Sequence, residues 1–233
     1  MSNKQSAFEQ AFKTVCPSGK VNGVDLIYPF GQICSFLREN PESLSWRGKN
    51  KPSLDDSDGI IVLAKKFING YTRSDFPAQP GTVPDEMVSI VMQVAYGYSK
   101  AESVKIKIEH QHAMCAENCV GALLERYIDS VMRSYGWVWC CGEFVKAVDF
   151  ILPNESGWNA LQIKNRDNSE NSSSSAIRNN TNIQKWFRTF SRIGKTNWDN
   201  LPEMMQDKGL SEKDFIRFAK KYLKQQKVRL TQK

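Results

Sequence analysis

The sequence predicts an α/β fold, in which a mainly helical amino-terminal region precedes a central sheet flanked by helices. Three patterns predict this fold. Apolar residues recur every three or four positions within several segments of residues 1–100, as on one face of a helix. A longer stripe of the same kind follows over residues 116–135. Three short runs rich in Val, Ile, Trp and Phe come directly after it, as expected for consecutive strands.

Composition sets the limits for this fold. The chain has 233 residues, of which 40% are hydrophobic and 24% are charged, a balance typical of a globular protein and not of a disordered or collagen-like one. No segment reaches the roughly 18 consecutive apolar residues of a membrane span. The first 15 residues also lack the apolar stretch of a signal peptide. We therefore expect a cytoplasmic protein with no membrane partner, whose six Cys stay reduced.

The amino-terminal region, residues 1–100, predicts helices at 8–15, 27–37, 60–67 and 87–96, separated by segments rich in Pro, Gly, Asp and Ser. Before the last of them stand Pro, Asp and Glu, which are favoured in the first turn of a helix, where the helix dipole is positive. This region could supply a dimer contact or embrace a nucleic acid, and the sequence leaves both open.

Residues 101–233 predict the α/β part. A helix is expected over 116–135, because Leu124, Tyr127 and Ile128 belong to one apolar stripe and Gly136 follows as a stop. Strands are expected at 137–141, 144–152 and 159–165, since these runs are divided by turn residues. After a polar loop, a helix is expected over 182–190. A final amphipathic helix is expected from residue 211 to about residue 227.

Positive charge is concentrated in the last third of the chain. Residues 161–233 hold 16 Lys and Arg against 7 Asp and Glu, whereas the other 160 residues hold 16 against 18. A one-sided basic field attracts polyanions, above all nucleic acid, although a solvated surface can also be basic. Charge therefore favours a nucleic-acid partner without establishing it.

Two charged residues stand inside predicted strands. Asp149 lies in the apolar run VDFIL, and Lys164 ends the run LQIK, where burial would favour hydrophobic residues. If the two strands form a hairpin through PNESG, their polar ends meet at one edge of the sheet. An anionic metal ligand would then lie beside a cation that can act on a phosphate and its attacking water.

This pattern resembles the PD-(D/E)xK nuclease superfamily, which contains most type II restriction endonucleases. The resemblance covers residues 115–190 and falls on Asp149 followed by Gln162, Ile163 and Lys164. It implies a restriction-endonuclease-like core, with a mixed central sheet flanked by helices, over residues 101–233. Gln162 stands where the superfamily usually has Glu or Asp. Its amide oxygen can bind Mg²⁺ but brings no charge, so another carboxylate is expected to complete the site.

The preceding helix offers that carboxylate. The segment from Gly121 to Glu125 resembles the superfamily's helix in which a small residue precedes a Glu, so Glu125 is the first candidate. Glu117, two turns earlier, is the reserve candidate. An ordinary solvated helix Glu is the alternative interpretation of each.

The resemblance implies a catalytic set of Asp149, Gln162, Lys164 and Glu125. Mg²⁺ would be bound by Asp149, Glu125 and the Gln162 side chain or the Ile163 carbonyl, while Lys164 orients the attacking water. The implied activity is that of a type II restriction endonuclease, which makes sequence-specific double-strand cuts in DNA and leaves 5′-phosphates. A palindromic target implies a homodimer. A cognate DNA methyltransferase is also expected in the same system.

The polar loop after the third strand combines side chains that read base edges. Arg pairs with guanine, Asn with adenine, and Glu accepts from cytosine, whereas Ser suits phosphates as well. A flexible linker is the alternative interpretation. Together with the run AENCVGALLERYI, this loop resembles the SinI type of restriction endonuclease, which implies a GGWCC-like site. The candidate DNA-contacting residues are Arg166, Asn168, Ser169, Glu170, Asn171, Ser172, Ser173, Arg178 and Lys185.

Other functions fit parts of the pattern. A structure-specific repair or recombination nuclease on the same core would not need a base-reading loop, and a non-catalytic DNA-binding regulator would have no use for Asp149 and Lys164. A zinc site is a further possibility, but its four candidate ligands lie in or beside a predicted helix, so buried thiols are the favoured interpretation. These candidates are His110, His112, Cys115 and Cys119.

Overall fold

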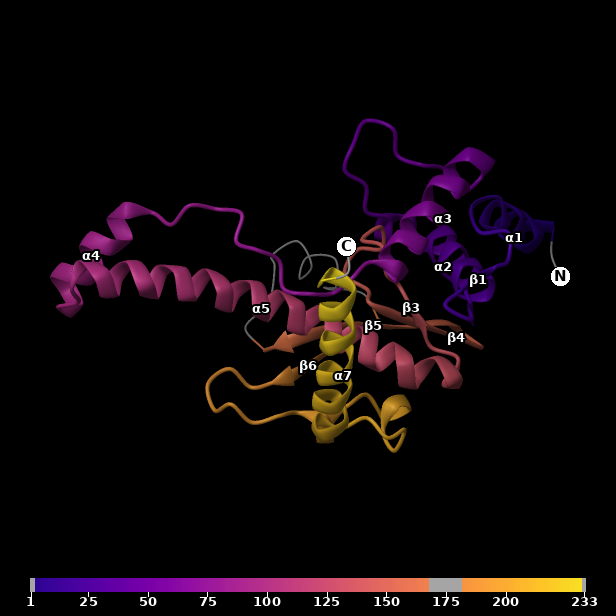
Figure 1. Cartoon of the computed structure of the whole chain (residues 1–233). Helices are drawn as coiled ribbons and strands as arrows, with labels where there is room; N and C mark the ends of the chain where they lie inside the picture. Colours follow the sequence, from indigo (N-terminus) through magenta and orange to yellow (C-terminus); the bar gives the residue numbers. More distant parts are fainter. Residues whose placement is uncertain (1–2, 168–181, 232–233) are drawn as a thin grey trace. The chain divides into compact units, whose positions relative to one another are not determined.

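A computed structural model describes residues 3–167 and 182–231, which belong to two compact units (Figure 1). Unit 1 consists of Met1–Arg73 and Glu125–Arg217, and unit 2 of Ser74–Leu124 and Phe218–Lys233. Two helices, α5 (Lys100–Met132) and α7 (Glu212–Thr231), contribute to both units. Each unit is therefore built from separate stretches of the chain.

Three helices open unit 1 and enclose an aromatic cluster. Phe12, Phe30 and Phe67 come from different helices, and their ring centroids lie 5.3 to 6.4 Å apart. The helices predicted at 8–15, 27–37 and 60–67 are confirmed, because the three-to-four spacing of apolar residues places these rings on facing sides. The elements are α1 (Asn3–Val15), β1 (Lys20–Val21), β2 (Val24–Asp25), α2 (Ile27–Glu39) and α3 (Ser57–Thr72).

A four-stranded mixed sheet forms the centre of unit 1 (Figure 1). The strands are β3 (Val138–Trp139), β4 (Phe150–Asn154), β5 (Gly157–Arg166) and β6 (Ile183–Thr189), in this order across the sheet. The first three strands are antiparallel neighbours, and β6 runs parallel to β5. The predicted fold class, a mixed central sheet flanked by helices, is confirmed.

The helix predicted over 182–190 is wrong, because this segment is strand β6. Ile183, Trp186, Phe187 and Phe190 are spaced as on a helix, but this spacing also suits a strand that is buried on both faces. The ten-residue β5 offers a row of backbone donors and acceptors, and β6 pairs with it from Ala160↔Ile183 to Arg166↔Thr189. Pairing with this long edge outweighs the local pattern.

Local backbone conformation moves two other predicted boundaries. The strand predicted from residue 144 begins only at 150, because Glu143 and Ala147 adopt left-handed conformations, with φ of 62° for both, that a strand does not accommodate. The helix predicted from residue 116 begins at 100 instead. Ser99 and Glu102 form reciprocal capping hydrogen bonds there, with Ser99 N–H donating to the Glu102 carboxylate over 2.8 Å.

Helices cover both faces of the sheet within unit 1. On one face Phe36 of α2 contacts Trp158 of β5 edge to face, with centroids 5.6 Å apart. On the other face Trp186 of β6 lies 5.0 Å from Trp198, which also contacts Tyr127 of α5 and Phe215 of α7. The alternation of side chains along β5 and β6 explains why the two Trp residues of the sheet point to opposite faces.

Two glycines allow α3 and the loop after β3 to pack closely against each other. A Cβ added to Gly70 would lie 2.3 Å from the Gly142 nitrogen, and one added to Gly142 would lie 2.7 Å from the Lys66 carbonyl oxygen. Gly142 also has a φ of +100°, which side chains disfavour. We expect Gly142→Ala to lower the free energy of unfolding by about 3 kcal/mol or more, measured by urea denaturation.

Gly121 supplies the matched control for this substitution. It lies inside α5, and an added Cβ would meet nothing within 4 Å. Gly121→Ala should raise the free energy of unfolding by up to about 1 kcal/mol, since Ala favours a helix interior. Equal effects of the two substitutions would contradict the close contact between α3 and the loop.

Unit 2 contains α4 (Glu86–Tyr96), most of α5 and the second half of α7. The helix predicted at 87–96 is confirmed as α4, and the predicted carboxy-terminal helix is confirmed as α7. The Asp75 backbone N–H donates to the hydroxyl oxygen of Tyr222 in α7 over 3.1 Å, which ties the two stretches of the unit together. Within the described residues, no helix has the length and apolar character that a bilayer span requires.

Candidate active site

Asp149 directly precedes β4 and is hydrogen-bonded to β5 and to Cys140, the residue after β3. Its backbone N–H donates to the Leu161 carbonyl over 2.8 Å, and its carbonyl accepts from Cys140 N–H over 2.8 Å. Its carboxylate accepts a further bond, since the Ile163 backbone N–H lies 2.6 Å from Oδ2. The backbone of β5 therefore fixes the position of the carboxylate.

The polar candidates of β5 share one face of the sheet with Asp149. Phe150 pairs with Leu161, so the register extended by one residue places Asp149 opposite Gln162. Lys164 follows two residues later and points to the same face. Lys185 of β6 pairs with Gln162 and joins this row. The predicted juxtaposition of the acid and the amine is thus present in the structure.

Burial changes the acidity of Asp149. Desolvation raises its pKa from 3.8 to about 6, although the Ile163 N–H bond and the charge of Lys164 both act to lower it. A carboxylate of this kind is destabilised as an anion, so it gains strongly from a cation that contacts it directly. Asp149 is therefore protonated at higher pH than an exposed Asp would be.

Glu125 of α5 is hydrogen-bonded to strand β3. The Trp139 Nε1–H donates to its carboxylate over 2.9 Å, which directs the side chain toward the strands. The buried thiol of Cys140 lies near both acids: its pKa is raised mainly by burial and further by the charges of Asp149, Cys141 and Glu125. The charges of Glu125 and Asp149 therefore both act on this thiol.

The donor set suits a hard divalent cation. It contains the Asp149 carboxylate, the Gln162 amide and the Ile163 carbonyl, which points to the same neighbouring strand as the Ile163 N–H. Oxygen ligands with few carboxylates fit Mg²⁺, which retains several of its waters. In the described ranges, no three or more His, Cys, Asp or Glu side chains cluster to hold a metal. Among these residues, the candidate zinc ligands therefore do not form a cluster that could hold the ion.

The other predicted residues are distributed as follows. Glu117 is exposed on α5 within unit 2, whereas Glu125 belongs to unit 1. Arg166 is exposed at the end of β5, and Lys185 is half-buried in β6. The remaining candidates for DNA contact lie outside the described residues: Asn168, Ser169, Glu170, Asn171, Ser172, Ser173 and Arg178.

Sequence reasoning missed the residues that position this site. Trp139 was not singled out as a site residue, yet its indole N–H donates to Glu125. Arg188 was not singled out, yet it donates to Asn165 over 3.0 Å and pairs with Glu212 over 2.6 Å, linking the ends of β5 and β6 to α7. No short motif encodes such contacts, because their partners lie 14 to 24 residues away.

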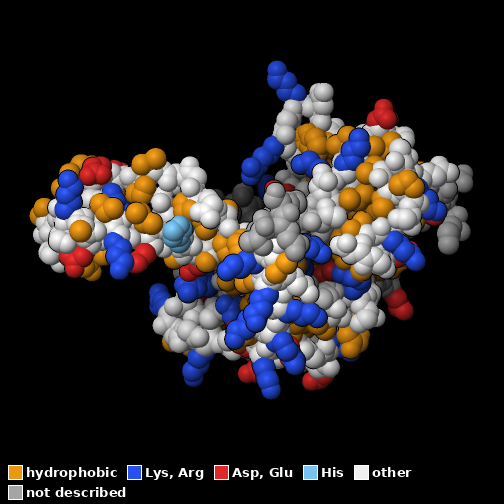
Figure 2. Space-filling model, in the orientation of Figure 1, with side chains coloured by type: hydrophobic (Ala, Val, Ile, Leu, Met, Phe, Trp, Pro, Cys, Tyr) orange, Lys and Arg blue, Asp and Glu red, His pale blue; other side chains and the backbone are white. Residues whose placement is uncertain are grey.

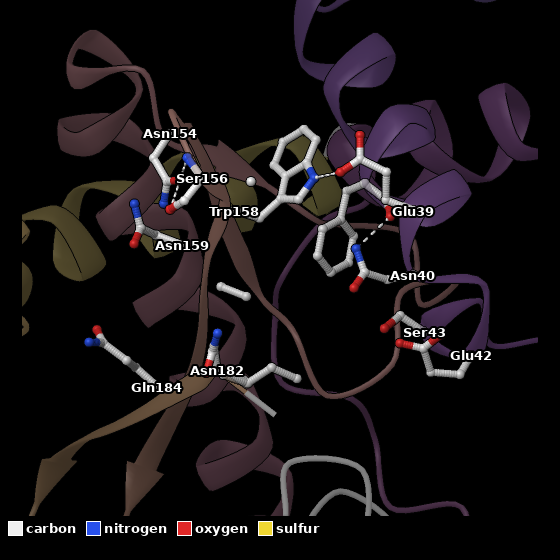
Figure 3. A pocket seen from close by; sticks show the side chains of 14 residues that line it. Glu39, Asn40, Glu42, Ser43, Asn154, Ser156, Trp158, Asn159, Asn182 and Gln184 are labelled. Carbon is white, nitrogen blue, oxygen red and sulfur yellow. Dashed lines mark hydrogen bonds between the residues drawn. The ribbon is translucent and has the colours of Figure 1, made fainter. Parts of the chain in front are cut away.

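A cavity of about 920 Å³ opens beside the site, between the amino-terminal ends of β5 and β6 and the end of α2 (Figure 3). Ala160 of β5 and Ile183 of β6 line it. Each lies two residues before a site residue, Gln162 and Lys185 respectively, and therefore points to the same face of the sheet. The polar lining combines neutral amides with the carboxylates of Glu39 and Glu42, and none of the described lining residues is Lys or Arg. The amides belong to Asn40, Asn154, Asn159, Asn182 and Gln184.

Comparison with known proteins gives consistent matches. A family model described as SinI restriction endonuclease matches residues 12–225. The type II restriction enzyme Eco47I of Escherichia coli is 45% identical over 203 residues, covering 85% of this chain and 88% of the relative. The type II restriction enzyme SinI of Salmonella infantis is 45% identical over 204 residues, covering 86% and 88%.

Proposed function

The chain belongs to the SinI restriction endonuclease family, and from this premise we propose that it cleaves both strands of DNA at a GGWCC-like sequence by Mg²⁺-dependent hydrolysis. The enzyme class, a type II site-specific endonuclease, follows from the family. The observation that carries the proposed chemistry is the 2.6 Å bond from Ile163 N–H to Asp149, because it fixes an acid next to the sheet face that bears Lys164.

The proposed metal ligands are the oxygens around Asp149. The Asp149 carboxylate and the Ile163 carbonyl lie at the junction of β4 and β5, Gln162 adds its amide, and Glu125 adds the second charge. Bound Mg²⁺ would polarise the phosphoryl group and lower the pKa of a bound water. The raised pKa of Asp149 supports this proposal, since a nearby cation favours the carboxylate form.

Lys164 is the proposed catalytic group that acts on the scissile phosphate. Its ammonium orients the attacking water and offsets the negative charge that develops on the phosphoryl oxygens. In-line attack by this water leaves a 5′-phosphate and a 3′-hydroxyl. Its place on the same sheet face as Asp149 and Gln162 supports the assignment.

Base recognition is proposed for the residues that follow the catalytic strand. Arg166 at the end of β5 and Lys185 in β6 carry positive charge near the site. The polar segment 168–178 supplies the Arg, Asn, Glu and Ser side chains that read base edges. The amide-lined cavity beside the site (Figure 3) offers the same chemistry. Its lack of cationic lining residues suits bases better than phosphates.

The wider setting follows from the proposed activity. A palindromic target calls for a homodimer whose two-fold axis matches that of the DNA. A cytoplasmic nuclease of this kind also requires a DNA methyltransferase that modifies the same sequence in the host.

A plasmid digest tests the proposal. We expect discrete fragments from a plasmid with GGWCC sites when Mg²⁺ is present, and none when EDTA replaces it. Fragments that T4 ligase rejoins without prior kinase treatment would carry the expected 5′-phosphate and 3′-hydroxyl. The matched substrate is the same plasmid with every GGWCC site altered by one base. Equal digestion of both plasmids would indicate a structure-specific or non-specific nuclease, and retarded migration without cutting would indicate a DNA-binding regulator.

The contribution of Glu125 gives a separate prediction. Glu125→Gln retains an oxygen that accepts from Trp139 Nε1 but removes one charge from the site. We expect cleavage to fall about 10- to 100-fold at low Mg²⁺ and to recover in part at high Mg²⁺, as measured by a Mg²⁺ titration of the cleavage rate. Glu117→Gln, on the exposed part of the same helix, should change little. The opposite result would transfer the role to Glu117.

A further inference from the structure

The hairpin formed by α4 and residues 100–114 of α5 is well defined (Figure 1). Gly97 ends α4 in a left-handed conformation with φ of 73°, and the Ser99–Glu102 capping bonds start α5 two residues later. Lys107 donates to the Asp85 carbonyl over 3.1 Å and Gln111 to the Thr82 carbonyl over 2.7 Å. These bonds hold α5 against the segment that leads into α4.

The hairpin is apolar outside and polar inside, the reverse of the usual order for a surface helix. Ser89, Ser103 and Lys107 are its buried residues. The large hydrophobic side chains are exposed instead, with Val83 at 93% and Val94 at 82% of their full accessible surface. Figure 2 shows hydrophobic side chains over this part of the surface. The exposed set is Val83, Met87, Val88, Ile90, Val91, Val94, Tyr96, Tyr98, Val104, Ile108 and Met114.

The size of this surface excludes an ordinary solvated face. Eleven large hydrophobic side chains of this hairpin are each at least 40% exposed, whereas a soluble monomer rarely exposes a contiguous apolar patch beyond a few hundred Å². A further protein surface is therefore needed to cover the hairpin.

Charge identifies the partner. Residues 82–114 contain three Lys and four Asp or Glu, so this surface does not have the positive field that DNA or an anionic membrane requires. Its ion pairs include Lys105 with Glu109 over 3.7 Å. A surface with balanced charges of both signs can face its own copy across a two-fold axis, because each cation then meets an anion of the other copy.

We infer that the α4–α5 hairpin is the dimer interface, and that it packs against the same hairpin of a second copy as a four-helix bundle. This inference rests on the proposed function only for the need of two copies at a palindromic site. The surface itself is independent of the chemistry. By this inference, unit 2 forms the dimer and the sheet of unit 1 binds the DNA.

The mass of the full-length protein in solution tests the inference. Without DNA or Mg²⁺, sedimentation equilibrium should give twice the chain mass of 26.6 kDa. The variant V91D/V94D should weaken the dimer about 1,000-fold or more, because each copy places two charges in an apolar interface, and should sediment at the single-chain mass. Ile193→Asp is the matched control, since Ile193 is 63% exposed in unit 1, and should leave the dimer intact.

Hydrogen–deuterium exchange keeps the test decisive if the double variant does not fold. In the unaltered protein, amides of residues 86–108 should exchange more slowly at micromolar than at low nanomolar concentration, because only the dimer covers them. A wild-type protein that stays a monomer, or a folded V91D/V94D that stays a dimer, would overturn the inference. So would a monomer that binds phosphatidylcholine vesicles through α4. The plasmid digest reports separately on the proposed function, because none of these measurements requires cleavage.

Discussion

Asp149→Asn should abolish cleavage, with a loss of about a thousandfold or more, and should make the protein more stable in EDTA. The loss follows from removing the charge of a proposed metal ligand that the β5 backbone positions directly, through the 2.6 Å bond of Ile163 N–H. The gain follows from removing a buried charge, because the amide oxygen of Asn can still accept that bond. DNA binding should remain measurable by gel shift.

The pH dependence of unfolding checks the physical reason. The folded-state pKa of Asp149, about 6, lies above its ordinary value of 3.8, so between these values the folded protein binds more protons than the unfolded chain. This contribution therefore favours folding at low pH and is lost as the pH rises through 6. We expect it to cost about 3 kcal/mol at pH 8, and the Asn variant should lack this slope.

Asp199→Asn provides the matched control, since Asp199 is exposed in the same unit. It should change neither cleavage nor the pH profile of the melting temperature. An Asp149→Asn protein that cuts at the normal rate would remove Asp149 from the site. A variant that is less stable than the wild type at pH 8 would show that the carboxylate is not destabilised by its burial.

Lys164→Ala should lower the cleavage rate about 100- to 1,000-fold while the protein still binds its site. The reason is that Lys164 shares the sheet face of Asp149 and Gln162, where its charge can stabilise the phosphoryl oxygens only as the transition state forms. Single-turnover cleavage and a gel shift in Ca²⁺ measure the two effects separately.

The control for Lys164 is Lys195→Ala, an exposed Lys in the same unit whose loss should leave the rate unchanged. Lys164→Ala should also allow the pKa of Asp149 to rise further, because the Lys164 charge lowers it. The pH at which cleavage is half-maximal should then shift upward. Normal single-turnover cleavage by the Ala variant would contradict the assignment.

Sequence patterns predicted those parts of the fold that depend on local periodicity. The helices that became α1 to α4 carry apolar residues at helical spacing; α1, α2 and α3 bury that side, whereas α4 leaves it exposed. The strands around Asp149 and Lys164 were predicted from β-branched and aromatic runs. Here local preference and tertiary packing agree.

The remaining features depend on contacts between distant segments. Residues 183–189 carry a pattern that fits a helix, and only the long edge of β5 makes them a strand. The bond between Trp139 and Glu125, like the pairing of Arg188 with Glu212, exists only once helix and strand are packed. The reversed polarity of the α4–α5 hairpin is also invisible locally, because apolar spacing does not reveal whether a face is covered.

The pairing of β6 with β5 has a consequence for synthesis in the cell. Unit 1 closes around Trp186, Trp198 and Phe215, and these residues are translated after nearly all the rest of the chain. The ribosome must therefore release the last fifth of the polypeptide before the sheet can be completed. A chain that ends before residue 183 therefore lacks the strand that completes the sheet beside β5.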